Sequence, residues 1–69
     1  MMQPDELLDL EDADLVSVLV ADALQGGDLI DRVRLSSWLV TLRPVQRDRM
    51  RLLAQCACNR LTVELRRRA

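Results

Sequence analysis

The longest unbroken helical pattern in the chain is PVQRDRMRLLAQCACNRLTVELRR, residues 44–67. Pro44 suits the first turn of a helix, where no backbone N–H is needed, and no glycine or proline follows it. One face collects apolar and small residues at spacings of three and four: Met50, Leu53, Ala54, Ala57, Cys58, Leu61 and Leu65. Such a helix extends roughly 36 Å, which is longer than a compact monomer of this mass needs. We therefore expect part of it to contact a partner.

Upstream of this pattern, residues 28–43 are predicted to form a second helix. Asp28 lies where an N-terminal cap is expected, and Asp31 lies three residues later, in the reciprocal position of a capping box. One apolar arc of about 100° on the helical wheel holds Leu35, Trp38, Leu39 and Leu42. A smaller arc on another side holds Leu29, Val33 and Val40. Two apolar sides predict two packing neighbours.

Further upstream, residues 12–25 are predicted to form the first helix. Their valines alternate as in a strand, but the polar residues share one arc of about 140°, which indicates a helix: Asp14, Ser17, Asp22 and Gln25. We expect an aspartate to cap its start, and Gly26 and Gly27 follow its end, where glycine adopts the left-handed conformation most easily. Residues 1–11 are acidic, and we expect them to form a frayed turn or a short helix that starts at Pro4.

These elements predict an all-α fold: one small three-helix domain over residues 1–69, built from a helical hairpin and a long C-terminal helix. A chain of 69 residues buries only about 60% of its unfolded surface, so we expect dimerisation or a partner to complete the core. An apolar content of 49% argues against a disordered chain. No apolar run approaches the roughly 20 residues that span a bilayer, and the acidic N-terminus is unlike a signal peptide. We therefore expect a cytoplasmic protein.

The formal charge of −1 conceals an acidic and a basic half. Residues 1–31 hold nine acids and no base, whereas residues 32–69 hold all ten arginines and two acids, Asp48 and Glu64. Either the halves pack together and partly neutralise, within one chain or across an antiparallel dimer, or one half stays free for docking. Candidate contacts to a basic partner are Asp5, Glu6, Asp9, Glu11 and Asp12.

Residue types that serve catalysis and metal binding are scarce. The chain has no histidine, tyrosine or lysine, and no serine or threonine has a base beside it in the pattern. We therefore expect no enzymatic activity, no small-molecule substrate and no cofactor. Cys56 and Cys58 form a Cys-x-Cys pair, but on a helix they point about 200° apart and cannot chelate one ion. We expect both to be small buried hydrophobes, with no metal site.

Trp38, the only aromatic residue, suits either the core or an interface, because tryptophan is enriched at binding hot spots. Its apolar arc and the apolar face of residues 44–67 give the predicted interface with a partner or a second copy. That interface comprises Leu35, Trp38, Leu39, Leu42, Met50, Leu53, Ala57, Leu61 and Leu65.

The arginines of the third helix raise the question of nucleic acid. Arg49, Arg60 and Arg67 form a stripe beside the apolar face. This stripe is either the solvated edge of an amphipathic helix or a contact surface for nucleic acid or an acidic partner.

A short motif resembles a DNA-binding family. LRPVQR, residues 42–47, is similar to the Leu-Pro-x-x-Gln-Arg opening of region 4 of bacterial sigma factors, and Thr62–Val63 with the later arginines resembles its recognition helix. That region needs a break and a tight turn between two helices, and residues 47–67 contain no glycine or proline. We therefore carry no residue over from the family.

The sequence favours a non-enzymatic protein–protein interaction module, such as a small adaptor, inhibitor or co-chaperone that docks through a helix face. The use of arginine without lysine suggests a GC-rich coding source, bacterial or phage. The alternative is a small DNA-binding transcriptional regulator that uses Arg49, Arg60 and Arg67 on DNA.

Overall fold

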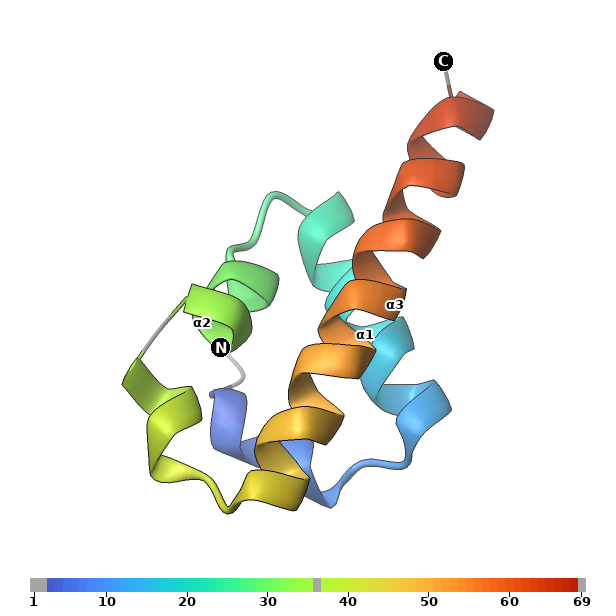
Figure 1. The fold of residues 1–69 in the computed structure, drawn as a ribbon. Coiled ribbons are helices and arrows are strands. Elements are labelled where there is room, and N and C mark those ends of the chain that lie inside the picture. The colour runs from blue at the N-terminus through green and yellow to red at the C-terminus, as the bar shows by residue number, and fades with distance from the viewer. Residues whose placement is uncertain (1–2, 36, 69) are drawn as a thin grey trace.

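A computed structural model describes residues 3–35 and 37–68. The described chain is an all-α fold, as predicted. Its elements in order are the 3-10 helix η1 (Pro4–Asp9), α1 (Asp12–Leu24), α2 (Leu29–Leu35), the 3-10 helix η2 (Ser37–Thr41) and α3 (Pro44–Arg68). The long C-terminal helix α3 packs against both α1 and α2 (Figure 1).

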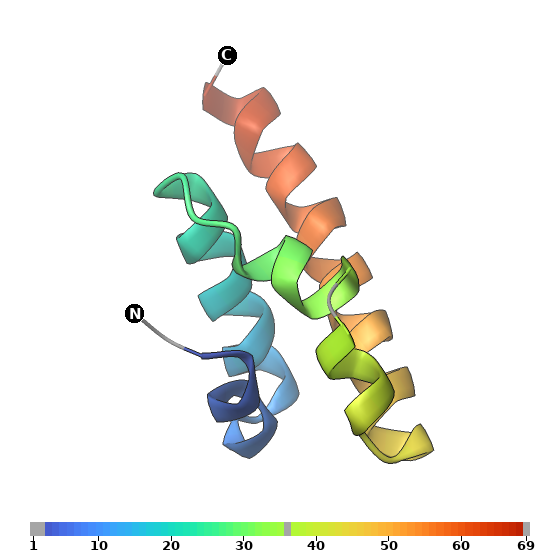
Figure 2. The same cartoon turned by 90° about the vertical axis from the view of Figure 1, so that its left-hand side faces the viewer.

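The long helix α3 is continuous over its 25 residues, because nothing after Pro44 interrupts its backbone hydrogen bonds. A continuous α3 does not contain the tight turn that separates two helices in region 4 of sigma factors. The molecule measures 39 × 21 × 19 Å, and its longest dimension corresponds to the length of α3, about 37 Å. The last turns of α3 extend past the ends of α1 and α2 (Figures 1 and 2).

The core is one apolar cluster to which every element contributes. Its α1 residues, Leu15, Val16, Leu19 and Val20, recur at the spacing of one helix face. No described polar or charged side chain is buried, so apolar burial holds the elements together. The other members are Leu7, Leu29, Ile30, Val33, Leu39, Met50, Leu53, Ala54 and Ala57.

Over its described part the N-terminal segment is a short helix that starts at Pro4, one of the two forms expected, and not a frayed turn. Residues 4–9 form η1, and Leu7 is fully buried in the core. The Gln3 N–H donates to Glu6 Oε2 at 3.3 Å, and the Glu6 N–H donates to the Gln3 carbonyl at 3.1 Å. Pro4 at the first position and the buried Leu7 side chain together explain why so short an element holds its place.

The predicted helix over residues 28–43 is divided, and this prediction was wrong in its extent. The α-helix α2 ends at Leu35, and η2 follows. Arg47 donates to two carbonyls in and after η2, from Nε to Leu39 O at 3.3 Å and from Nη2 to Leu42 O at 3.1 Å. In a continuous helix Leu35 and Leu39 would share a face. Instead Leu39 is buried and Leu35 is 78% exposed, so the predicted apolar arc does not form.

The turn between α1 and α2 uses the predicted glycines. Gly26 has a φ of +84°, the left-handed conformation that ends many helices. The Gly27 N–H donates to the Asp22 carbonyl at 2.9 Å.

The structure corrects the prediction of which residues cap the first two α-helices. Asp22 replaces Asp28 as the cap of α2, because its Oδ2 accepts a hydrogen bond from the Leu29 N–H at 2.9 Å. Asp28 instead pairs with Arg32 Nε at 3.4 Å. The residue before α1 is Glu11, and its side chain makes no capping bond.

Candidate functional site

The predicted interface residues differ in how far they are buried within the single chain. Leu39, Met50, Leu53 and Ala57 are buried in the chain's own core. Trp38, Leu42 and Leu61 are partly buried at its edge. Leu35 and Leu65 remain exposed. The four buried side chains are therefore committed to holding the fold, and they could reach a partner only if the chain opened.

The core-facing side of α3 continues beyond the other helices. Along it, Ala57 is fully buried, Leu61 is half-buried and Leu65 is 54% exposed. We call residues 59–68 the overhang, because they include the last turns of α3, which extend past the ends of α1 and α2 (Figure 2). The overhang thus has an apolar face. On this face the described chain leaves more than half of the Leu65 side chain exposed.

A shallow pocket of about 220 Å³ lies where the overhang leaves the other helices. Its apolar members come from three helices: Ala23 from α1, Ile30 from α2, and Cys58 and Leu61 from α3. Its α2 side also carries the polar residues Asp28, Asp31 and Arg34. The pocket and the exposed Leu65 together form an apolar surface on which the apolar face of another helix could pack.

The three arginines predicted for nucleic acid have different environments. Arg49 Nε donates to Asp12 Oδ1 at 2.8 Å, and Nη2 donates to the Leu10 carbonyl at 2.5 Å. Arg49 therefore ties α3 to the connection between η1 and α1. Arg60 Nη1 lies 3.5 Å from Ser17 Oγ, and Arg67 Nη1 lies 3.7 Å from Glu64 Oε1. Three exposed arginines, Arg66, Arg67 and Arg68, lie together at the end of the overhang.

The acidic and basic halves of the chain meet at few points. In the described chain, the Asp12–Arg49 ion pair is the one that joins distant elements, since the other two pairs lie within single helical turns. The acids predicted to contact a basic partner are all exposed: Asp5, Glu6, Asp9, Glu11 and Asp12. Most charge on both halves therefore faces solvent.

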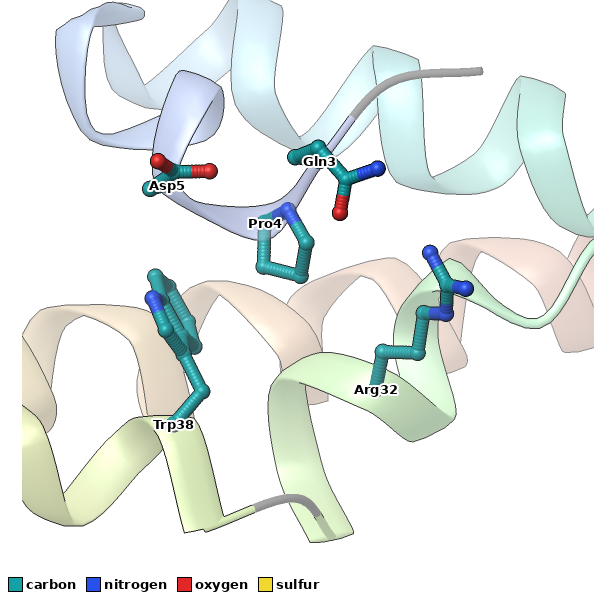
Figure 3. Close-up of a pocket in the computed structure, with 5 residues that line it drawn as sticks. All are labelled: Gln3, Pro4, Asp5, Arg32 and Trp38. Atoms are coloured by element: carbon teal, nitrogen blue, oxygen red, sulfur yellow. The ribbon is translucent and has the colours of Figure 1, made fainter.

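Trp38 forms one wall of an open pocket of about 410 Å³ between η1 and the α2–η2 segment (Figure 3). Its indole ring and the Arg32 side chain both point toward η1. The N-terminal side of the pocket is lined by Gln3, Pro4 and Asp5. Trp38 is half-buried, so it combines the two roles considered for it, packing at the core edge and remaining accessible.

The cysteines lie on different sides of α3, as their spacing predicts. Cys56 is exposed, which corrects the expectation that it is buried, and Cys58 is half-buried with its Sγ 3.5 Å from Arg34 Nη1. Among the described residues, no group of three or more histidine, cysteine or acidic side chains could hold a metal ion. No described helix is long and apolar enough to cross a membrane.

Sequence analysis missed a second apolar line on α3, on the side opposite the core. It consists of four exposed side chains at spacings of seven, four and seven: Val45, Leu52, Cys56 and Val63. The same helical wheel contains this signal. It is weaker than the core face because Arg49, Asn59 and Arg66 occupy the intervening positions. We call these four residues the outer stripe.

No protein-family model, curated protein or solved structure matches the chain. Its function is therefore inferred from these surfaces.

Proposed function

We propose that the protein is a non-enzymatic protein–protein interaction module, of the adaptor, inhibitor or co-chaperone kind. Its partner is an amphipathic helix of another protein, apolar on one face and acidic along the edge that meets α3. The observation that carries this proposal is the uncovered continuation of the core face, from the half-buried Leu61 to the exposed Leu65. Docking of an apolar helix face into such a groove is a recurring mode of peptide recognition.

Burial supplies the attraction in this proposal. Leu61 and Leu65 are four residues apart and share one side of α3. Leu61 also lines the pocket beneath the overhang, with Ala23 and Ile30. A partner helix laid there would cover Leu65 and fill the pocket, which extends the core along α3. Burial of a fully exposed leucine contributes about 1.5–3 kcal/mol, and Leu65, which is 54% exposed, would gain about half of that.

Charge sets the chemistry of the partner. Arg60, Arg66, Arg67 and Arg68 are exposed on the overhang, and Glu64, the one acid there, already lies near Arg67. A partner with carboxylates along its α3 edge would pair with these arginines, whereas a basic edge would be repelled. Asp31, on the α2 side of the pocket, favours the opposite charge. The arginines on the α3 side and Asp31 on the α2 side therefore favour opposite charges on the two edges of the bound helix, which fixes its orientation.

The same arginines would also attract nucleic acid, so the DNA-binding alternative is an outcome of the test. Two observations favour protein instead. Arg49 is held by Asp12 and the Leu10 carbonyl, which removes it from the predicted arginine stripe. The exposed Leu65 lies among the arginines, where a phosphate backbone offers an apolar side chain no partner.

Two synthetic helical peptides with the same leucine face, one edged with glutamate and one with lysine, test the proposal by fluorescence anisotropy against the full chain. We expect the glutamate peptide to bind at least about tenfold more tightly. Leu65→Glu should abolish this binding. Val40→Glu, on a residue of η2 that is 70% exposed, should leave it unchanged.

Equal binding of the glutamate peptide to the wild type and to Leu65→Glu would refute the overhang as the docking site. A labelled DNA duplex is titrated in parallel. The regulator alternative is supported if the duplex binds more tightly than the peptide, with an affinity that falls steeply with salt and a slope reduced by Arg67→Ala.

A further inference from the structure

We infer that a cleft between α2 and the first half of α3 binds a phosphate monoester through Arg34 and Arg51. The cleft has a volume of about 280 Å³. Its lining residues are Arg34 and Leu35 of α2 and Arg51 and Gln55 of α3. The helices α2 and α3 pack together (Figures 1 and 2). Arg51 and Gln55 lie before the overhang and need no partner helix, so the inference does not depend on the proposed function.

Helical spacing places the α3 members of the cleft on one side of that helix. Gln55 follows Arg51 by four residues and Cys58 follows it by seven, so the three side chains share a face. Arg34 Nη1 lies 3.5 Å from Cys58 Sγ. This contact brings the Arg34 side chain across from α2 to the same face of α3. The two arginines therefore border one cleft, although they come from different helices.

Most N–H groups of these side chains have no acceptor within the described chain. Arg51 makes no hydrogen bond or ion pair with a described residue. The Arg34 side chain bonds only the Cys58 sulfur there, which is a weak acceptor. Gln55 Nε2 donates one N–H to Asn59 Oδ1 at 3.1 Å and has a second N–H left. The cleft thus offers an anion several donors and the charges of both arginines.

The charges around the cleft also favour an anion. None of its lining residues is acidic. The nearest acids in the sequence are Asp31 and Asp48, each three residues before one of the two arginines. Neither of them forms an ion pair with those arginines in the described chain. Arg47, four residues before Arg51, adds a positive charge, although its guanidinium already bonds two backbone carbonyls. The surroundings of the cleft therefore remain positive.

Two arginines on separate helices suit a phosphoryl group better than a carboxylate. One guanidinium in a paired geometry already satisfies both oxygens of a carboxylate. A phosphate monoester has three terminal oxygens and a charge of roughly −1.5 to −2 at pH 7, which matches two guanidiniums and the Gln55 N–H. Leu35, which is 78% exposed, gives the organic part of the ester an apolar contact. The ester is either a small molecule or a phosphorylated side chain of another protein.

Nuclear magnetic resonance titration of the isotope-labelled full chain with ethyl phosphate tests the cleft. We expect saturable shifts at Arg34, Arg51 and Gln55. Arg34→Gln and Arg51→Gln should each weaken binding by at least about tenfold, because each removes charge-assisted hydrogen bonds. Arg43→Gln removes an exposed charge outside the cleft and should change the dissociation constant by less than about twofold. Circular dichroism checks that the three variants remain helical.

The proton of the ligand gives a second readout. The affinity for ethyl phosphate should rise from about pH 5 to about pH 7, because the ester loses its second proton near pH 6. The chain has no histidine that would titrate in this range. At pH 7 propionate, which carries a single charge, should bind at least about tenfold more weakly than ethyl phosphate.

A short flexible peptide with one phosphoserine distinguishes the two sources of the ester. Binding as tight as that of ethyl phosphate supports a phosphorylated protein as the source, and much weaker binding supports a small molecule. The inference is overturned if ethyl phosphate gives no saturable shifts at the cleft, or if the shifts concentrate on the arginines of the overhang. It is also overturned if Arg43→Gln weakens binding as much as Arg51→Gln does, or if propionate binds as tightly as ethyl phosphate.

Discussion

A carboxylate and a glycine specify the turn between the first two α-helices. Asp22 Oδ2 accepts the Leu29 N–H at 2.9 Å, and a Cβ built on Gly27 would overlap the Asp22 carboxylate. Gly26 provides the left-handed backbone beside it. Asp22 was predicted only as part of the polar stripe of the first helix. Its capping role depends on a turn that brings residue 22 to residue 29, and helical periodicity does not contain that contact.

We predict that Gly27→Ala lowers the free energy of unfolding by about 1 kcal/mol, the typical value of a helix cap. The added methyl group would push the Asp22 carboxylate away from the Leu29 N–H. Urea denaturation followed by circular dichroism measures this effect. In an Asp22→Ala background the same substitution should cost markedly less, because the cap is already lost. An equal cost in both backgrounds would show that the cap is not involved.

Among the elements, α1 and α3 were predicted well because each has a strong apolar period and a clear end. The division between α2 and η2 was not predicted, because no glycine or proline interrupts residues 28–43 and their apolar residues fit one helical wheel. Arg47 bonds the Leu39 and Leu42 carbonyls, eight and five residues earlier, and helical periodicity does not contain such contacts. For η1 the sequence left two forms open, a frayed turn and a short helix. Three leucines in an acidic segment form no helical stripe, and Leu7 gains its place only from packing against the folded core.

We predict that Leu7→Ala destabilises the protein by about 2–5 kcal/mol, the range for truncating a buried leucine. Leu7 is fully buried, although it belongs to a 3-10 helix of six residues. Leu8→Ala is the matched control, because the neighbouring Leu8 is only partly buried and should cost less. Thermal or urea unfolding of both variants measures the difference. Equal, small effects would mean that η1 is not part of the core.

At the scale of the whole molecule, α3 has three kinds of surface. One side closes the core, the overhang continues that side beyond the other helices, and the outer stripe faces away. The radius of gyration is 11.7 Å, whereas a compact chain of this length would have about 11 Å. The described chain leaves Leu65 on this helix 54% exposed, and the expectation that part of the helix contacts a partner stays a prediction. Predicting which residues would remain uncovered required the positions of α1 and α2.

The central claim is that the body of α3 stabilises the fold and that the overhang does not. Urea unfolding of Leu65→Glu beside Leu53→Ala, at one chain concentration, tests it most directly. Leu53 is buried and Leu65 is more than half exposed. We predict that Leu65→Glu stays within about 0.5 kcal/mol of the wild type, while Leu53→Ala loses about 2–5 kcal/mol. A loss for Leu65→Glu as large as that for Leu53→Ala would contradict the claim, because the overhang would then be part of the folded core.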